Sequence, residues 1–132
     1  MCFIIGGKKK ADKEIVCYKI LIEDKEGILR SPYYLKIWKL KEEQTEKLTE
    51  EKVKISEKQI EKRTSTGFYT FVSRKIARTT ALYVFKSKTK GNFKIFKCII
   101  PKGSKYYVGS FYKDEFCSEK LIIKRKLIFN LI

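Results

Sequence analysis

The sequence contains no histidine, and its four cysteines stand far apart in the chain. Without histidine, Ser-His and Cys-His nucleophile pairs cannot form, and neither can the usual motifs of zinc deaminases and metalloproteases. Cys2, Cys17, Cys98 and Cys117 include no closely spaced pair, which disfavours a structural zinc site. We therefore expect free thiols in a reducing compartment, with no metal and no disulfide.

Long apolar runs are also missing. No segment of about 18 apolar residues is present, and the short apolar start lacks the basic region of a signal peptide. We therefore expect a cytoplasmic protein that makes no membrane contact. A chain of 132 residues with 43% apolar and 14% aromatic residues is long enough for one domain, spanning 1–132, with its own hydrophobic core.

Acidic residues are scarce in the second half of the chain. Residues 1–66 hold 16 basic and 12 acidic side chains, whereas residues 67–132 hold 15 basic and 3 acidic ones. The net charge of +16 favours association with an anionic partner and makes such binding salt-dependent. We expect nucleic acid or a nucleotide-like molecule, with an acidic protein surface as a further alternative. Lysine enrichment from an AT-rich genome would explain the total charge, but not its uneven distribution.

Short β-branched and aromatic runs predict a fold built mainly from strands. Strands are expected at residues 14–22, 33–40, 67–72, 93–100 and 105–109, and within 119–130. A helix is expected at about residues 74–86, with Ser73 as its N-cap. We interpret Lys8-Lys9-Lys10 and residues 111–117 as loops. The pattern predicts an α+β domain with a curved, mainly antiparallel sheet and one principal helix.

Residues 41–63 differ from the rest because lysine and glutamate dominate them. Up to about residue 51, Glu–Lys pairs such as Glu43 and Lys47 have helical spacing. Too few apolar residues are present for a buried helix. We expect either a short exposed helix or a long, mobile charged excursion, with a strand beginning near Val53.

Eight basic residues of the second half are the candidate anion contacts. Three lie in the first turns of the expected helix, where cations oppose the helix dipole. Two others are interleaved with tyrosines, an arrangement that can hold phosphates and stack bases. The eight candidates are Arg74, Lys75, Arg78, Lys102, Lys105, Lys124, Arg125 and Lys126.

The order of several short motifs resembles the ADP-ribosyltransferase layout. Tyr18-Lys19 ends a strand, Gly67-Phe68 begins another that carries Thr70, and Ser73 precedes the helix. Ser118-Glu119 leads into the final strand. The chain is also similar to small uncharacterised phage-encoded proteins with a Gly-Phe strand and an Ile-Pro-Lys-Gly-Ser segment.

The resemblance implies an NAD-using enzyme in which Glu119 is catalytic and Lys19, Thr70 and Ser73 lie near the nucleotide. Lysine stands at position 19 where that family has arginine, and the Glu-x-Glu pair is absent. We therefore expect a phage-type protein that binds an anion without catalysis and without a cofactor. The alternatives are NAD-dependent transfer and a structural or host-factor-binding role.

Overall fold

The computed structural model describes residues 3–31, 36–85, 92–110 and 114–127. The elements follow in the order β1 (Phe3–Lys10), β2 (Ile15–Glu23), β3 (Leu29–Arg30), β4 (Ile37–Trp38), β5 (Glu43–Thr45), β6 (Glu51–Ser56), β7 (Gln59–Thr64), β8 (Phe68–Phe71), α1 (Arg74–Thr80), a π-helical turn η1 (Ala81–Phe85), β9 (Asn92–Ile100), β10 (Lys105–Gly109), β11 (Glu115–Ser118) and β12 (Lys120–Lys126).

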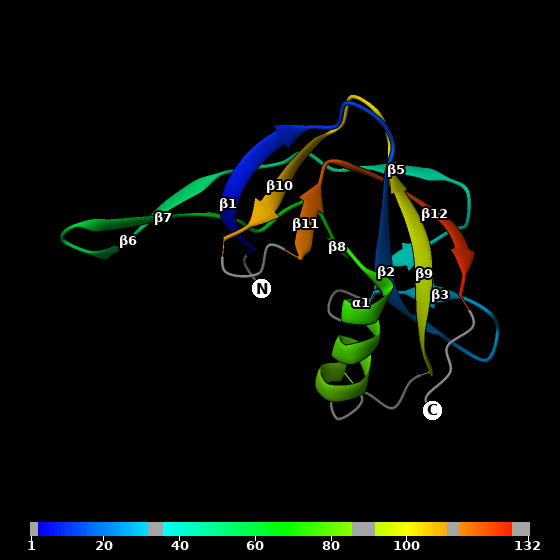
Figure 1. Cartoon of the computed structure of the whole chain (residues 1–132). Helices are drawn as coiled ribbons and strands as arrows, with labels where there is room; N and C mark the ends of the chain where they lie inside the picture. The colour runs from blue at the N-terminus through cyan, green and yellow to red at the C-terminus, as the bar shows by residue number, and fades with distance from the viewer. Residues whose placement is uncertain (1–2, 32–35, 86–91, 111–113, 128–132) are drawn as a thin grey trace.

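The described strands form one open sheet in which every ladder is antiparallel (Figure 1). Its order is β5-β12-β9-β2-β8-β11-β10-β1-β7-β6, and β3 and β4 branch from β2. The β2–β9 ladder is the longest continuous pairing, running from Ile15–Ile100 to Glu23–Asn92. A mainly antiparallel sheet with one principal helix is therefore confirmed.

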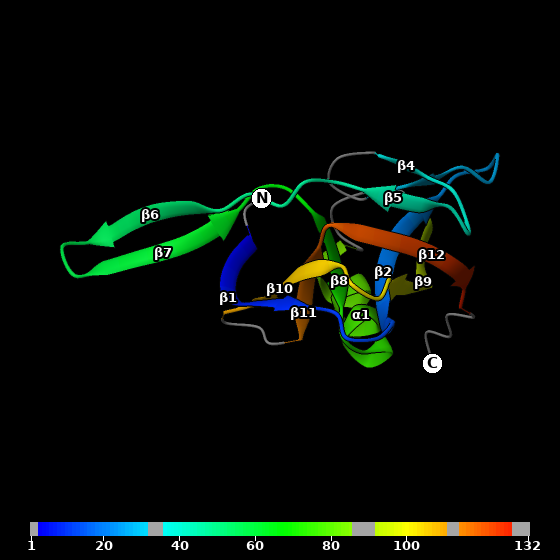
Figure 2. The same cartoon turned by 90° about the horizontal axis from the view of Figure 1, so that it is seen from above.

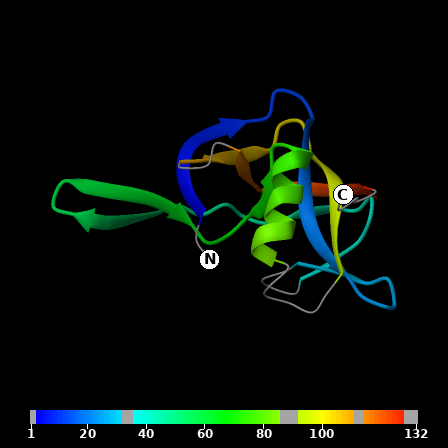
Figure 3. The same ribbon diagram turned by 60° about the horizontal axis from the view of Figure 1, so that its bottom comes forward.

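The two faces of β2 enter two different apolar clusters, because successive side chains of a strand point to opposite faces. Cys17 and Leu21 are fully buried in a cluster that also contains Phe96. Ile20 points the other way and packs against Ala77 of α1. Figure 3 shows α1 lying beside β2. Burial of both faces makes β2 and β9 the centre of the fold.

The helix begins as the sequence predicts. The Ser73 side chain accepts a hydrogen bond from the Ile76 backbone N–H at 3.2 Å, which satisfies one free donor of the first turn. Ala77 and Ala81 are buried, so small side chains allow the helix to approach the sheet closely. The helix continues as the π-helical turn η1 to residue 85, and residue 86 of the predicted helix lies outside the described part.

Strands β6 and β7 form a hairpin that projects away from the rest of the sheet, which we call the arm (Figure 2). A short helix before residue 51 is therefore wrong: Glu43–Thr45 pairs with β12, and an irregular segment then leads to the arm. Glu–Lys pairs stabilise a helix by only about 0.2–0.5 kcal/mol each. The free edge of β12 offers backbone hydrogen bonds that outweigh such pairs. The mobility expected of this excursion stays a prediction.

Two segments interpreted as loops are strands. Lys8, Lys9 and Lys10 end β1 and pair with β10, and residues 115–118 form β11 between β8 and β10. Of the strand predicted at 33–40, Ile37–Trp38 is present as β4, whereas residues 33–35 lie outside the described part. Residues 111–113 lie outside it as well.

Candidate anion-binding surface

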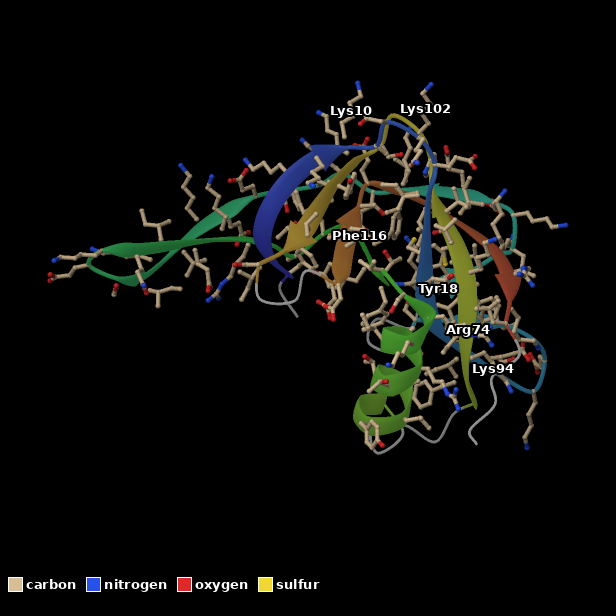
Figure 4. The ribbon with its side chains drawn as sticks, in the orientation of Figure 1. Lys10, Tyr18, Arg74, Lys94, Lys102 and Phe116 are labelled. Atoms are coloured by element: carbon tan, nitrogen blue, oxygen red, sulfur yellow. The ribbon has the colours of Figure 1, made fainter. Side chains whose placement is uncertain are left out.

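Six exposed lysines gather where β1 ends, β2 begins and the β9–β10 turn passes beside them. Lys10 stands directly opposite Lys105 in the β1–β10 ladder. The Gly103 N–H donates to the Ala11 carbonyl at 2.7 Å and holds the two turns together. Figure 4 shows Lys10 and Lys102 at the same extremity of the molecule. We call this group the lysine tip, and it consists of Lys8, Lys9, Lys10, Lys13, Lys102 and Lys105.

The lysine tip is only partly neutralised by acidic neighbours. Asp12 and Glu14 lie exposed in the β1–β2 turn. The Glu119 carboxylate accepts a hydrogen bond from the Lys105 backbone N–H at 3.0 Å. Neither Lys10 nor Lys105 forms an ion pair in the described residues. Like charges placed directly opposite each other on neighbouring strands are destabilising, so the Lys10–Lys105 pair is a local excess of positive charge.

Glu50 joins the lysine tip to the arm. Its carboxylate forms an ion pair with Lys8 and approaches the Lys62 amine of β7 at 3.7 Å. The hydrogen bond and charge of Lys8 lower the pKa of Glu50, and the same contact raises the pKa of Lys8. Glu50 therefore links Lys8 of the tip to Lys62 of the arm, with one carboxylate between the two amines.

The eight predicted anion contacts do not form one site. Lys102 and Lys105 belong to the lysine tip. Arg74, Lys75 and Arg78 lie on α1, which Figure 1 places at the opposite end of β2 and β9 from the tip. Lys124, Arg125 and Lys126 lie at the end of β12, where the ladder with β9 contains a bulge.

The three β12 cations have different surroundings. Lys126 forms an ion pair with Glu23 at 3.1 Å. Arg125 stands opposite Lys97 of β9, and neither of these forms an ion pair with a described acidic side chain. Lys124 lies exposed within the bulge. This region is therefore a second, separate positive surface.

The four residues that the NAD-using alternative requires have structural contacts in the fold. The Lys19 amine donates to the Tyr69 carbonyl at 2.8 Å, next to the buried Thr70. Ser73 caps α1, and Glu119 receives the backbone N–H described above. Lys19 and Thr70 are thus close to each other, whereas the Glu119 carboxylate is turned toward β10.

Lys19 lies in an unusual environment for a charged side chain. Its amine is 5.4 Å from the centre of the Trp38 ring, a cation–π distance. Burial is the main cause that lowers the pKa of Lys19, and the charge of Lys36 lowers it further. Nearby cysteine thiols act in the opposite direction. Lys19 therefore interacts with the core and not with the exposed positive surfaces.

An open, mainly apolar cleft of about 500 Å³ lies beside β4. Leu29, Trp38 and Phe96 contribute apolar surface, and the Glu23–Lys126 ion pair contributes polar groups. The described residues that line this cleft do not pair a nucleophile with a general base.

The described residues contain no group of three or more potential metal ligands brought together. No helix in the described ranges has the length and apolar character needed to cross a membrane.

No family model matches this sequence, and neither the curated proteins nor the solved structures contain a significant match. The chemistry of the chain itself must therefore carry the functional argument.

Sequence reasoning missed the first-half lysines of this surface. Lys8, Lys9 and Lys10 follow two glycines, a pattern that predicts a solvated turn. The arm carried a usable signal: the segment Lys52-Val53-Lys54-Ile55 alternates charged and apolar residues with the period of a strand. The contact between residues 8–10 and 102–105 has no sequence signal, because it depends on pairing strands far apart in the chain.

Proposed function

We propose that this protein binds a polyanion through the lysine tip, without catalysis, and that nucleic acid is its ligand. The observation that carries the proposal is the Lys10–Lys105 pair, in which two exposed like charges stand opposite each other and form no ion pair with a described acidic side chain. A row of phosphates would remove this repulsion. Release of counterions from the polyanion would provide most of the binding free energy.

The surface shape also supports a polymer over a small anion. The tip lysines come from two turns and the ends of two strands, and they continue through Glu50 onto the arm. A compact nucleotide site would need convergent groups in a pocket, whereas an extended phosphate backbone needs spaced cations along a surface.

The test is a fluorescence-anisotropy titration of a labelled 30-base-pair DNA duplex over a series of salt concentrations. The tip variant carries Lys10→Gln, Lys102→Gln and Lys105→Gln. The matched control carries Lys25→Gln, Lys39→Gln and Lys41→Gln, which remove three exposed lysines elsewhere. We expect the slope of log affinity against log salt to fall by about 2–3 in the tip variant, because each phosphate contact contributes roughly 0.9.

Three results would overturn this proposal. The first is an absence of duplex or single-strand binding at low salt. The second is an equal loss in the tip and control variants, which would mean that only total charge matters. The third is tight binding of ATP with a shallow salt dependence, which would indicate a nucleotide site instead of a polymer surface.

A further inference from the structure

The arm separates its charges between its two faces. Directly opposed residues of an antiparallel pair lie on the same face. Lys52 pairs with Lys62, and Lys54 pairs with Ile60, so three lysines and one isoleucine share one face. We call this the basic arm face, and it consists of Lys52, Lys54, Lys62 and Ile60.

The opposite arm face is nearly neutral. Glu51 pairs with Arg63, and Val53 pairs with Glu61. Arg63 also forms an ion pair with Glu61 on this face. The arm has little net charge in total, so only the segregation of its side chains by strand register produces a positive face.

Ile60 is exposed to an extent that the fold does not require. It is 67% exposed and belongs to the outer of the two residue pairs that make up the basic arm face. Ile55, at the bulge near the arm's end, is 52% exposed. Single exposed apolar side chains are common on protein surfaces, so Ile60 matters here because it shares a face with three lysines.

The base of the arm is attached to the rest of the fold by hydrogen bonds and by strand pairing. The Thr49 hydroxyl lies 3.0 Å from the Thr66 hydroxyl and 3.3 Å from that of Thr64. Phe3 and Ile4 of β1 pair with the end of β7. Among the described strands, β6 pairs only with β7. The contacts at the base therefore fix the orientation of the arm relative to β1.

We propose that the arm lies in the major groove of double-stranded DNA, with its basic face toward the DNA. This inference rests on the proposed polyanion binding and specifies the ligand. A major groove about 12 Å wide admits a two-stranded β-ribbon, whereas the narrow deep groove of an RNA duplex does not. The six residues of β6 span roughly 20 Å at about 3.3 Å per residue, enough to follow the groove.

Each part of the basic arm face then has a defined role. Lys52, Lys54 and Lys62 contact phosphates along the groove walls, while Ile60 contacts apolar edges of bases such as the thymine methyl group. The lysine tip follows the adjoining phosphate backbone, because Glu50 keeps Lys8 beside Lys62. The opposite arm face, with its carboxylates, points away from the DNA.

The experiment compares duplex and single-stranded DNA of the same sequence. Ile60→Ala removes the apolar contact of the basic face, and Val53→Ala is the matched control on the opposite face. We expect Ile60→Ala to weaken duplex binding about 5- to 20-fold, and Val53→Ala to change it less than about 2-fold. Neither variant should change single-strand binding. A Lys52→Gln, Lys54→Gln, Lys62→Gln variant should lower the duplex salt slope by about 2–3.

Competition identifies the groove. Methyl green, which occupies the major groove, should displace the protein, and distamycin, which occupies the minor groove, should not. Displacement by distamycin alone would overturn the assignment of the arm to the major groove.

Several results would overturn the inference while leaving polyanion binding intact. One is that the Ile60→Ala variant and the triple-lysine arm variant bind duplex DNA as tightly as the wild type, while the tip variant still binds more weakly. Another is tighter binding to single-stranded DNA or duplex RNA than to duplex DNA. A third is concentration-dependent dimerisation without DNA, seen by sedimentation and abolished by Ile60→Ala, which would make the arm a self-association element. Loss of all polyanion binding in the wild-type protein would instead contradict the proposed function itself.

Discussion

The β2–β9 ladder and the arm are both antiparallel strand pairs, but they differ in what covers them. Apolar clusters cover both faces of β2 and β9, where Ile20 and Ile95 meet the helix and Leu21 and Phe96 meet the other side of the core. The arm has neither face covered beyond its base. Its residues Ile55 and Ile60 remain exposed.

This difference separates stability from binding. A covered ladder gains free energy from burial, at roughly 25 cal/mol per Å² of apolar surface. An isolated two-stranded hairpin is marginally stable in water, so the arm depends on its anchored base for its order. Substitutions in the ladder should therefore change the free energy of unfolding, and substitutions in the arm should change binding.

The largest expected effect comes from one substitution made in both regions. Ile95 is 1% exposed, and Ile95→Ala should lower the free energy of unfolding by about 2–5 kcal/mol, because lost burial and a cavity add together. Ile60→Ala should change it by less than about 0.5 kcal/mol. Urea denaturation followed by circular dichroism measures both. Equal losses would show that the arm packs against the body.

The next largest expected effect is a loss of folding stability at high pH, caused by the buried thiols. Burial raises the pKa of Cys17 from 9.0 to about 11, and it also raises the pKa values of Cys98 and Cys117. Because the folded pKa is the higher one, the stability contributed by the neutral thiol is complete below pH 9. It is lost as the pH rises from 9 toward 11. For Cys17 this loss is roughly 2–3 kcal/mol.

Cys17→Ala isolates this contribution. Lys19 acts with the opposite sign, since burial lowers its pKa and its protonated form is disfavoured in the folded state. Stability linked to Lys19 therefore rises with pH up to its unfolded pKa of about 10.5. The difference between wild type and Cys17→Ala should shrink between pH 9 and 11, as measured by urea midpoints. Parallel curves would contradict the burial argument, whereas Ile60→Ala should follow the wild-type pH dependence.

The elements at the centre of the fold could be predicted from the sequence, whereas those at its edges could not. β2 and β9 are β-branched apolar runs that are recognisable locally, and Ser73 marks the start of α1. β5 could not be predicted, because Glu43 and Lys47 fit a helical pair as well as an edge strand. The free edge of β12, distant in sequence, decides between them. β1 is not predicted, because two glycines followed by Lys8-Lys9-Lys10 have the pattern of a turn.

The candidate surface shows the same limit. Comparing the two halves of the sequence located the charge excess at residues 67–132 and selected Lys102 and Lys105. It could not show that β1 would carry Lys8, Lys9 and Lys10 to the same place. It also could not show that strand register would place the arm's lysines on one face, although the total charge of the arm is small.

The smallest expected effect compares two like-charge pairs, Lys97–Arg125 in the body and Lys52–Lys62 in the arm. Lys97→Glu turns the first pair into an attractive one and should raise the free energy of unfolding by roughly 0.2–1 kcal/mol. In the arm, Glu50 already lies near Lys62, and its charge also acts on Lys52. Lys52→Glu would therefore bring a second carboxylate beside Glu50, and it should give no gain in stability.

Urea denaturation at low and high salt distinguishes the two variants. The gain from Lys97→Glu should shrink at high salt, because these side chains are partly exposed and their interaction is screened. A gain of the same size from Lys52→Glu would mean that the arm contributes to global stability as the ladder does. That result would contradict the separation of binding from stability, since it requires the arm to unfold together with the core.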